Sequence, residues 1–118
     1  MNYDRIRQLL QAKAASGAEL LTADANAAYA SDMMSDVLAF VTDQSVLLTG
    51  LVNEQVIRTA AMLDMKCVIL VRNKQPTPGM LQLAAQNGIA ILTTGYNMYE
   101  SCGILYSNGL KEEGTNHG

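Results

Sequence analysis

The chain has 118 residues, of which 49% are hydrophobic, 16% charged and 5% aromatic, and its formal net charge is −3. This length fits one domain with a single core, and the apolar content argues against disorder. The weak negative charge gives no electrostatic reason to bind nucleic acid or an anionic membrane. No apolar run is long enough to span a bilayer, and charged side chains interrupt the N-terminal segment where a signal peptide would be apolar.

The two cysteines, Cys67 and Cys102, are not spaced as a metal-binding pair, and the one histidine, His117, lies near the C-terminus. These are too few ligands for a zinc site. Cys67 belongs to an apolar run with no basic neighbour, so we expect a buried, unreactive thiol. Cysteine usage of this kind fits a reducing cytoplasm.

The first third of the chain predicts a helix over residues 2–15, which Gly17 would follow. Residues 18–21 could form a first strand, and residues 22–30 are expected to be irregular or a weak strand. Ser31 can cap the next helix. Helical spacing predicts that this helix buries Met34, Val37, Leu38 and Val41.

From residue 45 the pattern is regular. Continuous apolar runs predict buried strands over residues 45–49, 66–71 and 89–92. Each run precedes a helix with an N-capping residue, namely Asn53, Thr77 followed by Pro78, or Asn97 with Glu100 three positions later. Gly88 is placed to end the second of these helices. Their predicted inward residues are Val56, Ile57, Ala60, Ala61, Leu63, Leu81, Ala84, Ala85, Met98, Cys102 and Leu105.

Strands that alternate with helices predict right-handed crossovers and a mainly parallel sheet. The predicted fold class is therefore α/β, a three-layer sandwich with helices on both faces of the sheet. We expect one domain over residues 1–110 and a polar, mobile tail over residues 111–118.

Ligands of open α/β sheets collect beyond the carboxyl ends of the strands. Glycine lets a backbone approach closely, helix N-termini offer N–H groups to anions, and an arginine adds a fixed charge. The alternative is that each Thr-Gly pair simply makes a tight turn, and neither GxGxxG nor GxxxxGK[ST] occurs. The candidate residues for a small anionic ligand are Thr49, Gly50, Asn53, Arg72, Asn73, Thr93, Thr94, Gly95 and Tyr96.

Catalytic groups are sparse. With His117 near the chain end, no serine or cysteine relay can be assembled. Asp32 and Asp36 could share a helix face and hold a divalent metal, but first-turn carboxylates also stabilise the helix dipole, and no further ligand can be named. We therefore expect no catalysis and no cofactor, and keep a metal-dependent enzyme as the least favoured alternative.

The low charge leaves apolar surface to cover, and symmetric association is the commonest way to cover it. We expect a homodimer. Its candidate interface residues are Met33, Met34, Tyr99 and Tyr106.

Four segments in order, residues 30–40, 47–51, 56–60 and 91–96, resemble the DRTGG domain family. The resemblance extends over about residues 2–110. It implies a fold similar to the N-terminal domain of HPr kinase/phosphorylase, without a kinase centre. Such domains occur alone, beside CBS domains in regulated pyrophosphatases, or ahead of a phosphotransacetylase domain.

The sequence departs from the signature that names the family. Leu51-Val52-Asn53 stands where an Asp-Arg pair is expected near Gly50, and Arg72-Asn73-Lys74 stands where a Thr-Gly-Gly turn is expected. The resemblance thus implies a non-catalytic regulatory, ligand-sensing or dimerising module. Because the signature residues are absent, it assigns no role to any residue of this chain. A small anionic ligand such as a nucleotide is the first hypothesis. The alternative is a pure interaction module for a partner enzyme or kinase.

Overall fold

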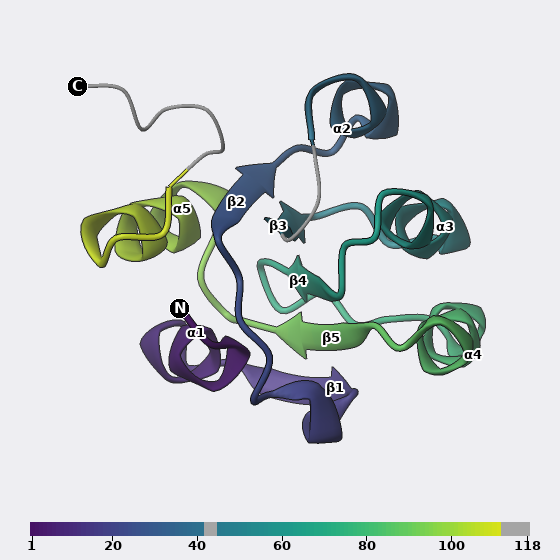
Figure 1. The fold of residues 1–118 in the computed structure, drawn as a ribbon, viewed down its shortest axis with the longest axis horizontal. Helices are drawn as coiled ribbons and strands as arrows, with labels where there is room; N and C mark the ends of the chain where they lie inside the picture. The colour runs from purple at the N-terminus through teal and green to yellow at the C-terminus, as the bar shows by residue number, and fades with distance from the viewer. Residues whose placement is uncertain (42–44, 112–118) are drawn as a thin grey trace.

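The computed structural model describes residues 1–41 and 45–111. Helices and strands alternate along most of the chain (Figure 1). None of the helices in the described ranges has the length and apolarity that a bilayer crossing requires. The elements in chain order are α1 (Tyr3–Leu9), β1 (Lys13–Ser16), a short 3-10 helix (Ala18–Leu20), β2 (Ala27–Ala30), α2 (Met34–Phe40), β3 (Ser45–Thr49), α3 (Glu54–Met62), β4 (Cys67–Leu70), α4 (Pro78–Asn87), β5 (Ala90–Thr93) and α5 (Met98–Ser107).

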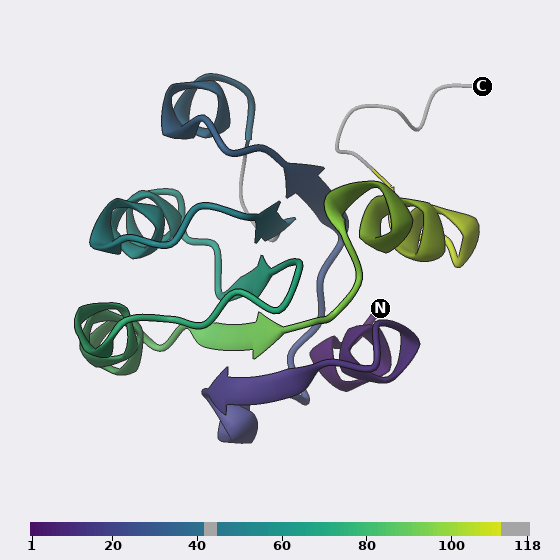
Figure 2. The same ribbon diagram turned by 180° about the vertical axis from the view of Figure 1, so that it is seen from behind.

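The strands form one sheet in the order β1-β5-β4-β3-β2. β2, β3, β4 and β5 are parallel, and β1 joins β5 in the antiparallel direction. Helices α2, α3 and α4 cover one face, while α1 and α5 cover the other (Figures 1 and 2). The predicted α/β three-layer sandwich is confirmed.

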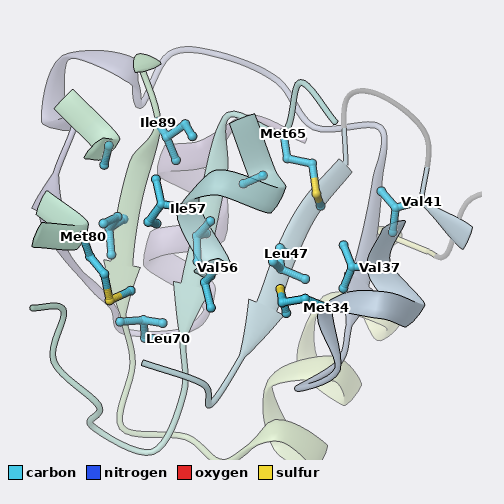
Figure 3. Packing of buried hydrophobic residues seen from close by; sticks show 14 residues of the cluster. Met34, Val37, Val41, Leu47, Val56, Ile57, Met65, Leu70, Met80 and Ile89 are labelled. Atoms are coloured by element: carbon cyan, nitrogen blue, oxygen red, sulfur yellow. The ribbon is translucent and has the colours of Figure 1, made fainter. Parts of the chain in front are cut away.

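Burial on both faces explains the continuous apolar runs, because every residue of β3, β4 and β5 is buried. Side chains alternate between two cores. One core lies between the sheet and α2, α3 and α4, and contains Leu47, Ile57 and Met80 (Figure 3). The other lies under α1 and α5 and contains the buried thiol of Cys67, as the sequence predicted.

The predicted helix starts after β3, β4 and β5 are confirmed. The side chains of Asn53, Thr77 and Asn97 each accept a hydrogen bond from the backbone N–H three residues on, at 3.3, 3.1 and 2.8 Å. Pro78 occupies the first turn of α4, and Gly88 ends that helix with φ 64°. These caps satisfy N–H groups that have no partner within the helix.

The N-terminal prediction is wrong in its second half. The helix predicted over residues 2–15 ends at Leu9, because Gln11 turns the chain at φ 49° and β1 then pairs with β5. Pairing along a sheet edge outweighs the helical propensity of the alanines here. Gly17 follows β1 rather than the helix, and a Cβ there would lie 2.7 Å from the Cα of Ala90.

Other local predictions need correction. Residues 18–21 hold a 3-10 helix and not a strand, whereas the weak strand expected within residues 22–30 is β2. Ser31 does not cap α2; its hydroxyl accepts the N–H of Met33 at 3.0 Å in a turn before the helix. Leu38 is exposed because α2 is the outermost helix of its layer. In α4 the predicted burial of Ala84 is confirmed, but Ala85 is exposed and Met80 is buried in its place. Most of the predicted tail, residues 112–118, lies outside the described residues.

Candidate functional site

The carboxyl ends of β2, β3, β4 and β5 meet along one edge of the sheet, because these strands are parallel and adjacent. Asp32, Gly50, Arg72 and Gly95 follow the four strands in that order. Neighbouring strands are about 4.8 Å apart, so the row spans about 14 Å. That length is comparable to a nucleotide.

At the β3 end the protein supplies its own anion. One carboxylate oxygen of Asp32, Oδ1, accepts the hydroxyl hydrogen of Thr49 at 2.9 Å and the N–H of Gly50 at 2.7 Å. The Thr49 hydroxyl in turn accepts the N–H of Leu51 at 3.1 Å. The donors expected to hold a ligand at Gly50 are therefore bonded to Asp32, which was not among the predicted ligand-binding residues.

The Asp32 carboxylate also bears on the metal hypothesis. Asp32 precedes α2 and Asp36 lies in its first turn. Within the described ranges, no cluster of three or more His, Cys, Asp or Glu residues is arranged to hold a metal ion. His117 lies outside those ranges.

At the β4 end the backbone is strained. Arg72 and Asn73 both adopt left-handed conformations, with φ 59° and 58°. Non-glycine residues in this region cost about 1–2 kcal/mol each, and such residues concentrate at functional sites. Two backbone bonds hold the turn against the next loop, from the Arg72 N–H to the Tyr96 carbonyl at 2.8 Å and from the Asn73 N–H to the Thr94 carbonyl at 2.9 Å.

A cavity of about 370 Å³ opens beside this turn, lined by Leu10, Gln11, Asn73, Gly95 and Tyr96. The structure thus brings Gly95 and Tyr96, both predicted, together with the turn between α1 and β1. Thr94 connects two segments of the wall, because its buried hydroxyl donates to the Leu10 carbonyl at 2.7 Å. Arg72 is exposed and precedes Asn73 in the chain.

Two predicted residues have structural roles instead. The Asn53 side chain caps α3, and Thr93 lies within β5, opposite Lys13 of β1, with 8% of its surface exposed. Gln11 lines the cavity but was placed inside a helix by the sequence pattern. No local signal marks it, because its place depends on the pairing of β1 with β5.

The thiols are poor nucleophiles. Burial raises the pKa of Cys67 to about 12, and burial also raises the pKa of Cys102. A thiolate is the reactive form, so neither residue is activated at neutral pH.

The predicted interface residues divide into two groups. Met34 is 8% exposed and packs in the core under α2, so it is not available on the surface. Met33, Tyr99 and Tyr106 are exposed. A second cavity, about 390 Å³ and lined mainly by apolar side chains, lies between β2 and α5 and includes Tyr106 in its lining.

Comparisons with known proteins agree with this architecture. The family model of the DRTGG domain matches residues 5–107. Among solved structures, the chain is similar to the CBS and DRTGG domains of the regulatory region of Clostridium perfringens pyrophosphatase, complexed with its activator, diadenosine tetraphosphate. The TM-score is 0.71 and the identity 14%, over 96% of this chain and 51% of that chain, so the present chain spans about half its length. No curated protein matches the chain.

Proposed function

Because this chain belongs to the DRTGG domain family, we propose that it is a non-catalytic regulatory module that senses a small anionic ligand such as a nucleotide. The observation that carries the proposal is the open cavity at the carboxyl end of β4 and β5, whose lining residue Asn73 directly follows the exposed Arg72 in the chain. An arginine keeps its charge at all physiological pH values and can bond two phosphate oxygens at once. The similar pyrophosphatase region, with its nucleotide activator, supports this class of ligand.

The position of the anion is argued from the different surroundings of Gly50 and Gly95. At Gly50 an added phosphate would meet the Asp32 carboxylate, and like charges repel. At Gly95 no carboxylate lines the cavity. We therefore place the anionic group at Arg72, with Gly95 and Tyr96 in the wall of the adjoining cavity and Thr94 holding their loop against Leu10. Thr49 and Gly50 are left out of the contact.

A thermal-shift panel of nucleotides and phosphorylated metabolites tests this function. At a ligand concentration tenfold above Kd, binding to the folded state contributes about 1.4 kcal/mol, which raises Tm by about 5 °C for a domain of this size. Arg72→Ala should lose the shift. Arg5→Ala is the matched control, because Arg5 is an exposed arginine on α1. A panel in which no compound raises Tm would overturn the proposal.

A second function, protein association, is favoured by the exposed apolar side chains. Within the described ranges, five of the six large apolar side chains that are exposed belong to two helices: Met33, Leu38 and Phe40 to α2 and its N-cap, and Tyr99 and Tyr106 to α5; the sixth, Met62, ends α3. These helices lie on either side of β2, the edge strand of the sheet (Figure 1). We propose that this edge joins a second copy of the chain, and that a partner enzyme or kinase is the alternative occupant.

Light scattering after size-exclusion chromatography tests the dimer. The wild type should elute with twice the monomer mass, and Phe40→Lys and Tyr106→Lys should each shift it toward a monomer without lowering Tm. Gln86→Lys is the control, since it adds the same charge to an exposed position of α4, at the other side of that helix layer. A monomeric wild type at micromolar concentration would contradict the homodimer.

The proposal places the protein in the cytoplasm as one regulatory domain over residues 1–110. Free thiols at Cys67 and Cys102 support a reducing compartment.

A further inference from the structure

The cavity lined by Gln11, Asn73, Gly95 and Tyr96 offers more than a place for charge. We propose that it binds the heterocyclic base of a nucleotide whose phosphate lies at Arg72. This inference rests on the proposed function and deepens it, because it names the part of the ligand that the cavity selects.

Three segments distant in sequence form the walls, and hydrogen bonds join them. The Thr94 hydroxyl ties the β5–α5 loop to Leu10 at 2.7 Å. The backbone N–H groups of Arg72 and Asn73 tie the β4–α4 turn to the same loop at 2.8 and 2.9 Å. A cavity whose walls are fixed before binding loses little conformational entropy when a ligand enters.

The lining suits a flat, neutral ring with hydrogen-bonding edges. Two of the lining residues, Gln11 and Asn73, carry side-chain amides, which can donate and accept side by side, as Asn and Gln do with the exposed edge of adenine. Tyr96, half-buried, adds an aromatic surface. The lining contains no carboxylate and no ammonium group, so it gives no preference to a charged ring.

Gly95 supplies the space. It has no side chain, and a Cβ built on it would lie 3.4 Å from the Asn73 Oδ1 atom. The volume of about 370 Å³ exceeds that of a single base, which leaves room for part of the sugar. A side chain larger than that of glycine at this position would occupy the space in front of the Asn73 amide.

The backbone conformation allows the two amides to be removed without disturbing the fold. Gln11 and Asn73 hold φ at 49° and 58°, a region that glycine adopts without steric cost. Asn73→Gly and Gln11→Gly therefore remove an amide and relieve backbone strain together. A residue with a purely structural role would lose stability on truncation, whereas these variants should fold with near wild-type Tm.

Isothermal titration with AMP, adenosine and ribose 5-phosphate tests the inference. Wild type should bind AMP at least tenfold more tightly than ribose 5-phosphate. Asn73→Gly and Gln11→Gly should each weaken AMP about tenfold and leave ribose 5-phosphate unchanged. Arg72→Ala should weaken both phosphates and leave adenosine unchanged, which separates the two halves of the site.

Three outcomes would overturn the inference, and they can be told apart. If AMP and ribose 5-phosphate bind equally and the glycine variants change neither, the anion site stands and the base site is refuted. If neither phosphate binds the wild type and the thermal-shift panel is also silent, the proposed function fails and the base site fails with it. A marked loss of Tm in both glycine variants, with no selective loss of AMP, would assign the amides a structural role instead.

Discussion

Two turns at the carboxyl edge of the sheet have nearly the same local structure and different surroundings. In each, a threonine precedes a glycine, and its hydroxyl accepts the N–H two residues on, at 3.1 Å for Thr49 and 3.3 Å for Thr94. An asparagine then caps the following helix in both. The two turns therefore share the pattern of Thr-Gly followed by a capping asparagine because both join a strand to a helix in the same way.

The turns differ in what each hydroxyl donates to and in what faces the glycine. Thr49 donates to the Asp32 carboxylate, which also accepts the Gly50 N–H. Thr94 donates to the buried Leu10 carbonyl, and Gly95 lines a cavity. A Thr-Gly turn is therefore not a ligand site by itself, since the surrounding residues decide whether its donors are already used.

The largest expected effect separates the two threonines. Thr94→Val should lower the free energy of unfolding by about 2–3 kcal/mol, because it strips a buried carbonyl and the Tyr96 N–H of their partner. Thr49→Val likewise strips the Leu51 N–H of its acceptor, but it should cost only about 1 kcal/mol, because Asp32 is exposed and water can replace the lost donor. Urea unfolding of both variants measures the difference, and equal losses would contradict the contrast.

Removing the internal anion should make the first turn resemble the second. Asp32→Ala should lower the free energy of unfolding by about 1–2 kcal/mol, because Gly50 and Thr49 lose a charged acceptor. It should also let inorganic phosphate raise Tm, measured in the Arg72→Ala background so that the proposed site does not contribute.

Asp36→Ala is the control for charge, since it removes a carboxylate that does not contact Gly50. Asp32→Asn keeps an acceptor oxygen and should retain most of the stability. A phosphate response of Asp32→Ala no larger than that of Asp36→Ala would show that the Gly50 turn binds no anion even when it is free.

Cys67 lies at the start of β4, away from the carboxyl edge of the sheet. Its ionisation should therefore change the free energy of unfolding equally in variants of either turn. The pKa of Cys67 rises from 9.0 to about 12 on burial, so above pH 9 the unfolded chain releases a proton that the folded chain keeps. Stability therefore falls as pH rises, by about 1 kcal/mol between pH 9 and pH 10.

Cys67→Ala should remove that loss. Thr94→Val and Thr49→Val should retain it, with their mutual difference unchanged. Chemical unfolding at the two pH values measures the slope, and a slope identical in wild type and Cys67→Ala would assign alkaline sensitivity to another group.

How far the sequence predicted these regions depends on whether the signal is local. β3 and the caps at Asn53, Thr77 and Asn97 follow from apolar runs and capping residues, and the structure confirms them. β1 was missed because four alanine-rich residues gain their strand conformation only from β5. The location of the candidate site was predicted because the carboxyl ends of parallel strands always meet at one edge of the sheet.

The residues that distinguish the two turns could not be read from the sequence. Asp32 reaches Gly50 from 18 positions away, and Leu10 meets Thr94 from 84 positions away. Both partners lie in segments whose boundaries were predicted wrongly or loosely. Local patterns predicted the two turns, while long-range packing decides that Gly95 lines a cavity and that the Gly50 N–H is bonded to Asp32.

The smallest expected effect concerns two buried hydroxyl groups, those of Ser101 and Thr94. Ser101 of α5 is fully buried, and its Oγ has no hydrogen-bond partner among the residues that the structure describes, whereas the Thr94 hydroxyl is bonded. Ser101→Ala should raise the free energy of unfolding by about 0.5–1 kcal/mol, from the higher helix propensity of alanine and the removal of an unsatisfied group.

Ser107→Ala separates these two causes, because Ser107 lies in the same helix, is exposed and donates to the Gly103 carbonyl at 2.6 Å. Propensity acts on both variants, so the Ser101 gain should exceed the Ser107 gain. Urea midpoints at constant slope measure both. Equal gains would mean that the Ser101 hydroxyl costs nothing, and that its burial differs less from that of Thr94 than the hydrogen bonds suggest.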